Sequence, residues 1–216
     1  MNPDFIELLQ LNDATFPIGN YTFSWGMETF IQQGLIKDEN SLKDYLQSEM
    51  EMSFLYGEIL AVMLSYNNCN NNKYLETIDE IYSASKSSFE IRDASRKLAT
   101  RFNKTVSNFY DSSKLFPAQS FCIAYGSYCG KKSFSIEDTL TTFIYSQLSA
   151  RVTTAVKLIP LSQNIGQKLL NELLQNIPDL IKQVKELTID ELCQSCPSLE
   201  IRSMQHEYLY TRLYSN

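Results

Sequence analysis

The chain has 216 residues, of which 44% are hydrophobic and 20% are charged, a profile typical of a globular protein with a sizeable core. Its formal net charge is −6, and residues 1–60 alone carry ten acidic and two basic side chains. This balance argues against a nucleic-acid partner. The first residues lack the basic start and apolar run of a signal peptide, and the most apolar later stretch, ILAVML at 59–64, is too short to cross a bilayer. We therefore expect a cytoplasmic protein with no membrane partner.

The first half of the chain shows apolar residues at helical spacing. Asn2 followed by Pro3 is typical of a helix start, with an N-cap and a proline at the first helical position. Ser41 with Asp44 resembles a capping box and predicts the start of a long helix that ends in the asparagine-rich stretch 67–72.

Two further helices are predicted over residues 74–85 and 89–110. In the second, the apolar positions, including Phe102 and Phe109, are expected to face the core, and the arginines are expected to face solvent.

The clearest helical pattern begins at Ser135, which with Asp138 repeats the capping signal, and runs until Pro160 stops it. Ser162 is predicted to cap the next helix. Two more helical segments are predicted over 178–187 and 198–214.

The overall pattern therefore predicts an all-α fold. Alternating strand runs and hairpin dipeptides are few, and seven glycines are scarce for an all-β chain. We expect a single-domain bundle of about eight to ten helices over residues 1–216, with no internal repeat.

The stretch GSYCGKKS at 126–133 resembles a phosphate-binding loop, which requires G-x-x-x-x-G-K-[ST] between a strand and a helix. Here only three residues separate Gly126 from Gly130, and no buried strand precedes them. We interpret the stretch as a turn between helices, and we expect no nucleotide hydrolysis by this chain alone.

The five cysteines are odd in number, and we expect no structural disulfide in a reducing compartment. Cys122 and Cys129 are interpreted as small buried hydrophobic residues. Cys193 and Cys196 have metal-ligand spacing, but a tetrahedral site needs four donors and His206 would make only three. We predict no cofactor and no metal site within one chain, although two subunits could pool ligands.

The last residues, MQHEYLYTRLY at 204–214, contain the single histidine together with several tyrosines and Arg212. Tyrosine and arginine are over-represented at interface hot spots because they combine large contact area with a polar tip. A last helix that packs its tyrosines into the core would explain the same composition. From composition alone the two interpretations stay open.

The stretch FPIGNYTFSWGMETFIQQG at 16–34 combines three glycines, a proline and several aromatic side chains. Together with LLQLNDAT before it, PLSQNIGQKLL at 160–170 and IRSMQHEYLYTRLY at the end, it resembles the urease accessory protein family UreF. A fourth segment, FEIRDASRKLATRF at 89–102, is similar to that family as well. These motifs are spread over nearly the whole chain.

The resemblance implies an all-α, non-catalytic factor for assembly of the nickel centre of urease. It implies an adaptor that forms a homodimer, binds the scaffold accessory protein UreD (also called UreH), and recruits the GTPase UreG to apo-urease. Through these contacts the GTPase cycle would be coupled to nickel insertion.

The resemblance also implies residues that contact partners. Carried over onto this sequence, they are Tyr21, Gly19, Glu28, His206, Tyr210 and Arg212. Gly19 and Gly26 are expected to act through the backbone, because a residue without Cβ allows positive φ and close approach. Arg212 is expected to hold the tail in the arrangement that partners bind.

Two alternative functions belong to other classes. One is a thiol-based metal-binding or redox protein that uses Cys193 and Cys196. The other is a helical enzyme, which would need a convergent set of acid and base groups in one pocket. The sequence offers no spacing that favours any such pair, so we assign no catalytic residue.

Overall fold

The computed structural model describes residues 2–20, 23–109, 111–112, 115–193 and 196–214. These residues fold into a single helical body in which no strand occurs, so the all-α prediction is confirmed. The α-helices and the π-helix (η2) are α1 Pro3–Leu11, α2 Met27–Gln32, α3 Glu39–Glu49, η2 Met50–Ile59, α4 Leu60–Asn67, α5 Asn72–Ser85, α6 Phe89–Phe109, α7 Phe121–Lys131, α8 Ile136–Leu158, α9 Gln163–Leu174, α10 Ile177–Val184 and α11 Pro197–Gln205. Two short 3₁₀ turns, η4 Ile189–Glu191 and η5 His206–Tyr208, flank α11.

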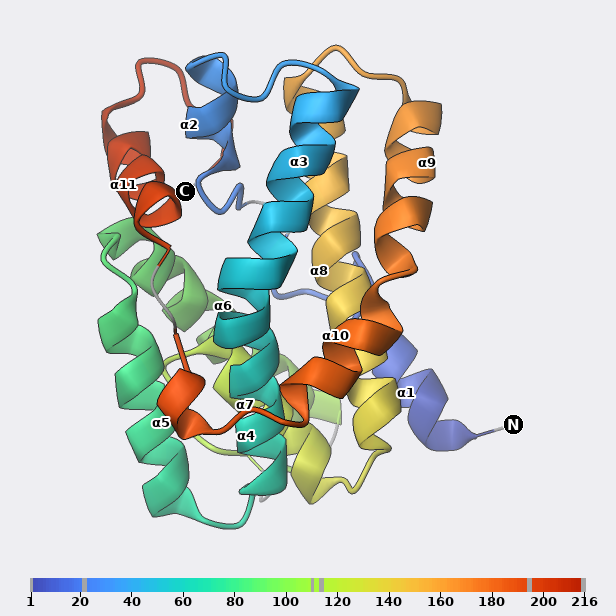
Figure 1. Cartoon of the computed structure of the whole chain (residues 1–216). Coiled ribbons are helices and arrows are strands. Elements are labelled where there is room, and N and C mark those ends of the chain that lie inside the picture. Colours follow the sequence, from blue (N-terminus) through green and yellow to red (C-terminus); the bar gives the residue numbers. More distant parts are fainter. Residues whose placement is uncertain (1, 21–22, 110, 113–114, 194–195, 215–216) are drawn as a thin grey trace.

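The helices are arranged around one long central rod (Figure 1), in which α3, η2 and α4 follow each other without a break. Counted with this rod as one, the described residues form ten helical rods, within the predicted eight to ten. The second long helix, α8, packs beside α4, and α9 and α10 return along its outer side. A contiguous core of buried apolar residues extends from Leu8 to Leu192.

Most predicted helix ends are confirmed, because they depend on local hydrogen bonds. The side chain of Asn2 accepts the N–H of Asp4 and caps α1. Ser135 and Ser162 cap α8 and α9 in the same way. Helix α8 ends at Leu158, just before Pro160.

Three predictions about local structure were wrong. The capping box of α3 is formed by Asp38 and Ser41, so Ser41 is the third residue of the helix and not its cap. Phe109 is 69% exposed at the end of α6 and does not face the core. The last α-helix ends at Gln205, and η5 together with the non-helical residues up to Tyr214 forms a tail over residues 206–214.

The stretch 126–133 was predicted to be a turn, but only its last two residues form one, because Gly126 and Gly130 lie inside α7. Both glycines face α4. A Cβ added at Gly126 would lie 2.4 Å from the carbonyl oxygen of Val62, and one at Gly130 would lie 2.4 Å from that of Tyr66. The two glycines therefore let the backbones of α4 and α7 approach each other closely.

A buried ion pair joins α8 to the central rod. Arg151 of α8 donates from Nε to Glu49 Oε1 at 2.9 Å, and its guanidinium lies over the ring of Phe54 at 4.7 Å. Glu58 lies on the other side, 3.9 Å from the same guanidinium. Burial raises the pKa of Glu49, and the positive charge of Arg151 opposes this shift. Arg151 therefore joins α8 to Glu49 at the end of α3 and to Glu58 near the end of η2.

No helix among the described residues is long and apolar enough to cross a membrane.

Replacing Gly126 by alanine should destabilise the fold by about 1–3 kcal/mol, because the added methyl group would overlap the backbone of α4. Alanine at Gly57 is the matched control, since its Cβ would meet only the Lys86 ammonium at 3.5 Å, an ordinary contact. Urea denaturation measures both free energies of unfolding. An equal, small change in the two variants would contradict the packing of α7 on α4.

Candidate functional site

The C-terminal segment lies against the segment that contains residues 16–34. In Figure 1, α2 (blue) and α11 (red) are neighbours at one end of the molecule, far from α1, and the helices contact each other. The side-chain amide of Gln32 in α2 donates to the carbonyl of Thr211 at 2.7 Å, and Gln33 donates to Gln205 at 3.1 Å. The two stretches that carry the strongest sequence motifs therefore form one surface.

Glu28 is the residue that holds this surface together. It lies in the first turn of α2 and is only 1% exposed. Its carboxylate accepts the backbone N–H of Leu213 at 2.9 Å and that of Tyr214 at 3.2 Å. The same carboxylate lies 3.0 Å from Nε2 of His206. One buried side chain thus fixes three positions of the tail.

His206 continues the network to α6. Its ring is fully buried, and its Nδ1 lies 2.7 Å from Oε2 of Glu90, in the first turn of α6. Each of the two ring nitrogens therefore lies within hydrogen-bond distance of a buried carboxylate oxygen. Glu90 also accepts a hydrogen bond from the guanidinium of Arg212. We name these four residues, Glu28, Glu90, His206 and Arg212, the tail network.

The tail network brings two carboxylates together with one guanidinium and one imidazole. Each carboxylate lies in the N-terminal turn of a helix, where the helix dipole favours negative charge. Removing one member of a buried pair leaves an uncompensated charge, which costs more than the intact pair contributes. The arrangement therefore specifies one position of the tail.

Gly26 and Gly19 shape the backbone of the segment 16–34, as the sequence predicted. Both have positive φ, +85° and +81°. A Cβ on Gly26 would lie 2.4 Å from the hydroxyl oxygen of Ser203 in α11, so glycine is required for the close approach of α11 to α2. At Gly19 a Cβ would lie 2.6 Å from the guanidinium of Arg101, which donates to the carbonyl of Ile18 at 3.1 Å.

The outer side of the tail is apolar and aromatic. Tyr210 is completely exposed, and Tyr208 and Leu213 are largely exposed. On α11 itself, Ile201 and Met204 are about half exposed. The tail therefore has a polar inner side, bound to Glu28 and Glu90, and an apolar outer side open to solvent.

The predicted site residues fall into three groups. Glu28 and His206 are buried and hold the tail from within, and Gly19 acts through its backbone. Tyr210 and Arg212 lie at the surface, Arg212 with its guanidinium on Glu90. Tyr21 lies outside the described residues.

Sequence reasoning missed Glu90 and Ser203. Glu90 was assigned no role from the sequence, although it stands in the segment 89–102 that carries part of the family resemblance. Its role depends on a contact with His206, 116 positions away, which spacing does not reveal.

The cysteines are free thiols. Burial raises the pKa of Cys122 to about 12 and that of Cys129 further, which agrees with their interpretation as buried hydrophobic residues. Cys193 and Cys196 are partly exposed and line one cavity of about 360 Å³ beside Lys86. Burial raises the pKa of Cys193, while the positive charge of Lys86 opposes the shift. Within the described ranges no group of three or more His, Cys, Asp or Glu side chains could hold a metal ion.

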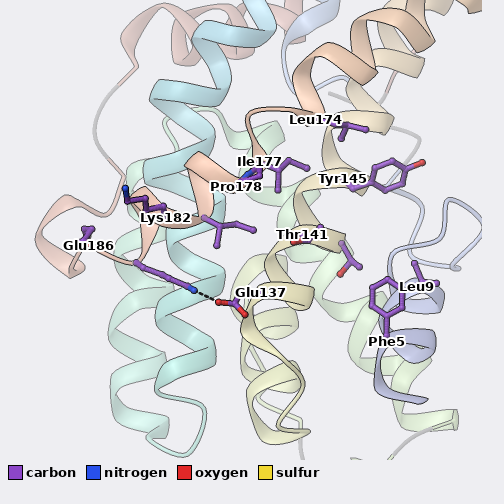
Figure 2. Close-up of a pocket in the computed structure, with 13 residues that line it drawn as sticks. Phe5, Leu9, Glu137, Thr141, Tyr145, Leu174, Ile177, Pro178, Lys182 and Glu186 are labelled. Atoms are coloured by element: carbon purple, nitrogen blue, oxygen red, sulfur yellow. Dashed lines mark hydrogen bonds and ion pairs between the residues drawn. The ribbon is translucent and has the colours of Figure 1, made fainter. Parts of the chain in front are cut away.

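A second surface lies on the other side of the body, between α1, α8 and α10. Figure 2 shows an apolar groove there, with Phe5 and Leu9 of α1 on one side and Ile177 and Pro178 of α10 on the other. Its volume is about 780 Å³, and Tyr145 projects from α8 at its edge. The ion pair between Lys185 and Glu137, at 2.6 Å, marks the polar rim.

An all-helical body without an assigned catalytic group, whose two terminal motifs form one ordered surface, has the features of a binding protein. Comparison with known proteins identifies the family: the UreF family model matches residues 36–174. The urease accessory protein UreF of Actinobacillus pleuropneumoniae is 32% identical, with 96% of each chain covered. The UreF proteins of Haemophilus influenzae (strain PittEE) and Streptococcus salivarius (strain 57.I) are 31% and 25% identical, over 98% of this chain and 95% and 94% of theirs. The chain belongs to the UreF family of urease accessory proteins.

Replacing Glu28 by glutamine should release the tail, because one acceptor oxygen for the N–H groups of Leu213 and Tyr214 is lost. A hydrogen bond to a charged group contributes about 1.5–3 kcal/mol, so amide exchange in the tail should be at least about tenfold faster. Hydrogen exchange followed by mass spectrometry measures this in the peptide that contains residues 206–214. Glu51→Gln, an exposed glutamate of η2, is the matched control. Unchanged exchange in Glu28→Gln would show that the tail is held by other contacts.

Proposed function

We propose that this protein is a non-catalytic adaptor in the maturation of urease. In this proposal it binds UreD/UreH, and the complex recruits the GTPase UreG to apo-urease and couples its nucleotide cycle to nickel insertion. Nickel is cargo of the assembly and is not a resident cofactor of this chain. The cytoplasmic location stays a prediction.

The observation that carries the proposal is the two-sided tail. A protein that only packs its last residues into a core has no need of a buried carboxylate for their backbone N–H groups, nor of a tyrosine left fully exposed. Exposed Tyr208, Tyr210 and Leu213, presented on an ordered backbone, supply the residue types that dominate interface energies. Ordering the tail in advance lowers the entropy that a partner must remove on binding.

This geometry supports a proposed role for each site residue. Tyr210 is proposed to touch a partner directly. His206, Glu28 and Arg212 are proposed to act by holding the tail, and Gly19 by shaping the backbone of the segment 16–34. Tyr21 stays a proposed contact on the ground of the family resemblance alone.

Replacing Tyr210 by alanine should weaken binding of UreD/UreH by about tenfold or more, the effect of removing an interface hot spot. The variant should leave amide hydrogen exchange in the tail unchanged, because the side chain of Tyr210 is fully exposed to solvent. His206→Gln should weaken binding as well, but together with faster tail exchange. Co-purification with tagged UreD/UreH, and urease activity after co-expression of all accessory proteins, measure the two effects.

The matched control is Phe109→Ala, an exposed aromatic residue at the far end of α6. It lies 19 residues from Glu90, about 28 Å along the helix. If Tyr210→Ala and His206→Gln both co-purify like the wild type and activate urease fully, the tail is not the docking surface.

The proposed homodimer is supported by the groove between α1, α8 and α10. Its walls and its surroundings expose Phe5, Ile6, Leu9 and Tyr145, apolar or aromatic side chains that a second copy would cover. A twofold interface uses the same patch on both subunits, and a groove flanked by projecting apolar side chains is able to complement itself. This surface is far from the tail, so dimer formation leaves the tail open for partners.

Replacing Leu9 by lysine should shift the protein from dimer to monomer, raising the dimer dissociation constant by about tenfold or more, because a charge would be buried without a partner. The monomer should stay folded, since Leu9 is 51% exposed and lysine suits the end of a helix. Leu35→Lys is the control, a leucine that is 50% exposed outside this groove. Sedimentation equilibrium gives both constants. A wild type that is monomeric, or a Leu9→Lys protein that dimerises normally, would refute the proposed interface.

The thiol-based alternative is supported only by the shared cavity of Cys193 and Cys196 beside Lys86. If the double variant Cys193→Ser, Cys196→Ser activates urease fully, the thiol-based function is excluded and the adaptor is the single function proposed.

A further inference from the structure

A cavity beside α11 contains a charged group that the tail network does not explain. The cavity has a volume of about 360 Å³ and lies between η2, the end of α5 and α11. Its walls include Ser53 and Gly57 of η2, Lys86 after α5, and Ile201 and Met204 of α11. Ile201 and Met204 are also part of the apolar outer surface beside the tail, so a protein that covers this surface would cover the cavity as well. We name it the Lys86 cavity.

Lys86 is the unusual member of this cavity. The residue is only 7% exposed, and its ammonium lies over the ring of Tyr82, 4.9 Å from the ring centre. Among the described residues the ammonium has no hydrogen-bond acceptor and no ion-pair partner. Its Nζ is not one of the unpaired polar atoms that are closed off from the surface, so a ligand in the cavity can reach it. An ammonium carries three donors, and burying them without an acceptor is costly.

The charge of this ammonium is already balanced, although its donors are not used. Burial favours the uncharged amine, but the negative charges nearby, first of all Glu58, outweigh burial and raise the pKa of Lys86. Glu200, in the cavity wall, accepts the backbone N–H of Ser87 at 2.6 Å and forms no ion pair with Lys86. The two glutamates would repel a further carboxylate, whereas a neutral oxygen meets no such repulsion. The cavity therefore favours a neutral acceptor over an anion.

Ser53 supplies a second unused donor in the same cavity. It is 9% exposed, and its hydroxyl has no hydrogen-bond partner among the described residues and is not closed off from the surface. Gly57 follows about one turn later on η2, and a Cβ built there would lie 3.5 Å from Nζ of Lys86. The hydroxyl and the ammonium therefore lie along one wall. A carbonyl oxygen has two lone pairs and accepts from two such donors at once.

The size of the cavity limits what can enter it. Its volume of about 360 Å³ is at the small end of the range of ligand pockets, so it suits a side chain or the tip of a loop and not a whole helix. Ile201 and Met204 supply apolar surface beside the two donors. This combination of a few polar groups with apolar walls fits an amide group on a short aliphatic stem.

We propose that the Lys86 cavity receives a neutral carbonyl oxygen of the protein that docks on the tail, held by the Lys86 ammonium and the Ser53 hydroxyl. The oxygen belongs to the main chain of a loop or to an asparagine or glutamine side chain, since all of these carry the same amide group. The inference rests on the proposed adaptor function and adds to it the chemistry of one contact outside the tail network.

The test measures the affinity of the full chain for purified UreD/UreH by biolayer interferometry. Lys86→Met should weaken binding by about tenfold or more, because a hydrogen bond from a charged donor is lost. Ser53→Ala should weaken it by about threefold, the effect of one neutral hydrogen bond. Both variants should leave amide hydrogen exchange in residues 206–214 unchanged, which separates them from His206→Gln. Lys73→Met, at an exposed position of α5, makes the same change in net charge and should have no effect.

Glu200→Gln distinguishes a neutral occupant from a charged one. Glutamine keeps an acceptor for the N–H of Ser87 and removes one negative charge from the cavity wall. A neutral carbonyl should bind with an affinity that changes by less than about twofold, whereas a carboxylate should bind about threefold more tightly or better. Tighter binding of Glu200→Gln would overturn the assignment of a neutral group.

The inference and the adaptor proposal fail in different ways. If the wild type binds UreD/UreH and both Lys86→Met and Ser53→Ala bind equally well, the inference is wrong and the adaptor proposal stands. If the wild type does not bind at all, the adaptor proposal is wrong, and the inference falls with it. Urea denaturation verifies that each variant is folded. Should Lys86→Met be unfolded, Ser53→Ala decides, because it removes a single hydroxyl group and leaves the charges of the cavity in place.

Discussion

The buried carboxylate of Glu28 is the constraint on which the arrangement of the chain ends depends. It accepts two backbone N–H groups from the tail and faces His206 as well, while it is almost completely removed from solvent. Such a carboxylate has few positions in which its hydrogen bonds are satisfied, because water is not there to replace a missing donor. The tail has few apolar contacts of its own to fix it, so the direction of residues 209–214 follows from the donors that Glu28 and Glu90 require. Specificity of conformation is the contribution of this network, and its net contribution to stability is smaller.

The sequence allowed the helices to be predicted where the signals are local. The caps at Asn2, Ser135 and Ser162 each consist of one side chain and an N–H two or three residues later, so spacing alone identifies them. The error at Ser41 has the same origin. Asp38 and Ser41 form the capping box, but Asp44 lies at the same spacing after Ser41 and gave the same pattern in the sequence. The periodicity of apolar residues predicted that Phe109 would be buried. This pattern continues to the last residue of α6, but the side chain of Phe109 is exposed there.

The site was predictable only in part, because its contacts join residues that are far apart in the chain. Positive φ at Gly19 and Gly26 could be expected from composition, whereas the partner that makes Gly26 necessary, Ser203, is 177 residues away. Gly126 and Gly130 suggested a turn. The sequence does not distinguish a glycine that forms a turn from a glycine that allows another helix to approach closely. The family resemblance implied that His206 and Arg212 belong to one partner-binding site. The structure shows that both contact Glu90 of α6, which the resemblance did not indicate.

The division of the tail into a held side and an open side has a consequence for how an adaptor of this kind would be tuned. In the proposed function, residues that hold the tail would change affinity through the population of the binding-competent conformation, so a partner's apparent dissociation constant would rise by the factor by which that population falls. Residues such as Tyr210 would change affinity through the contact itself. Because the holding contacts are a few charge-assisted hydrogen bonds and not a packed core, the free energy that separates the held tail from the released tail is of the order of a few kcal/mol. The free energy of a single binding event can supply a difference of that size. In the proposed function, binding of one partner would therefore be coupled to binding of the next through the tail network rather than through the helical body.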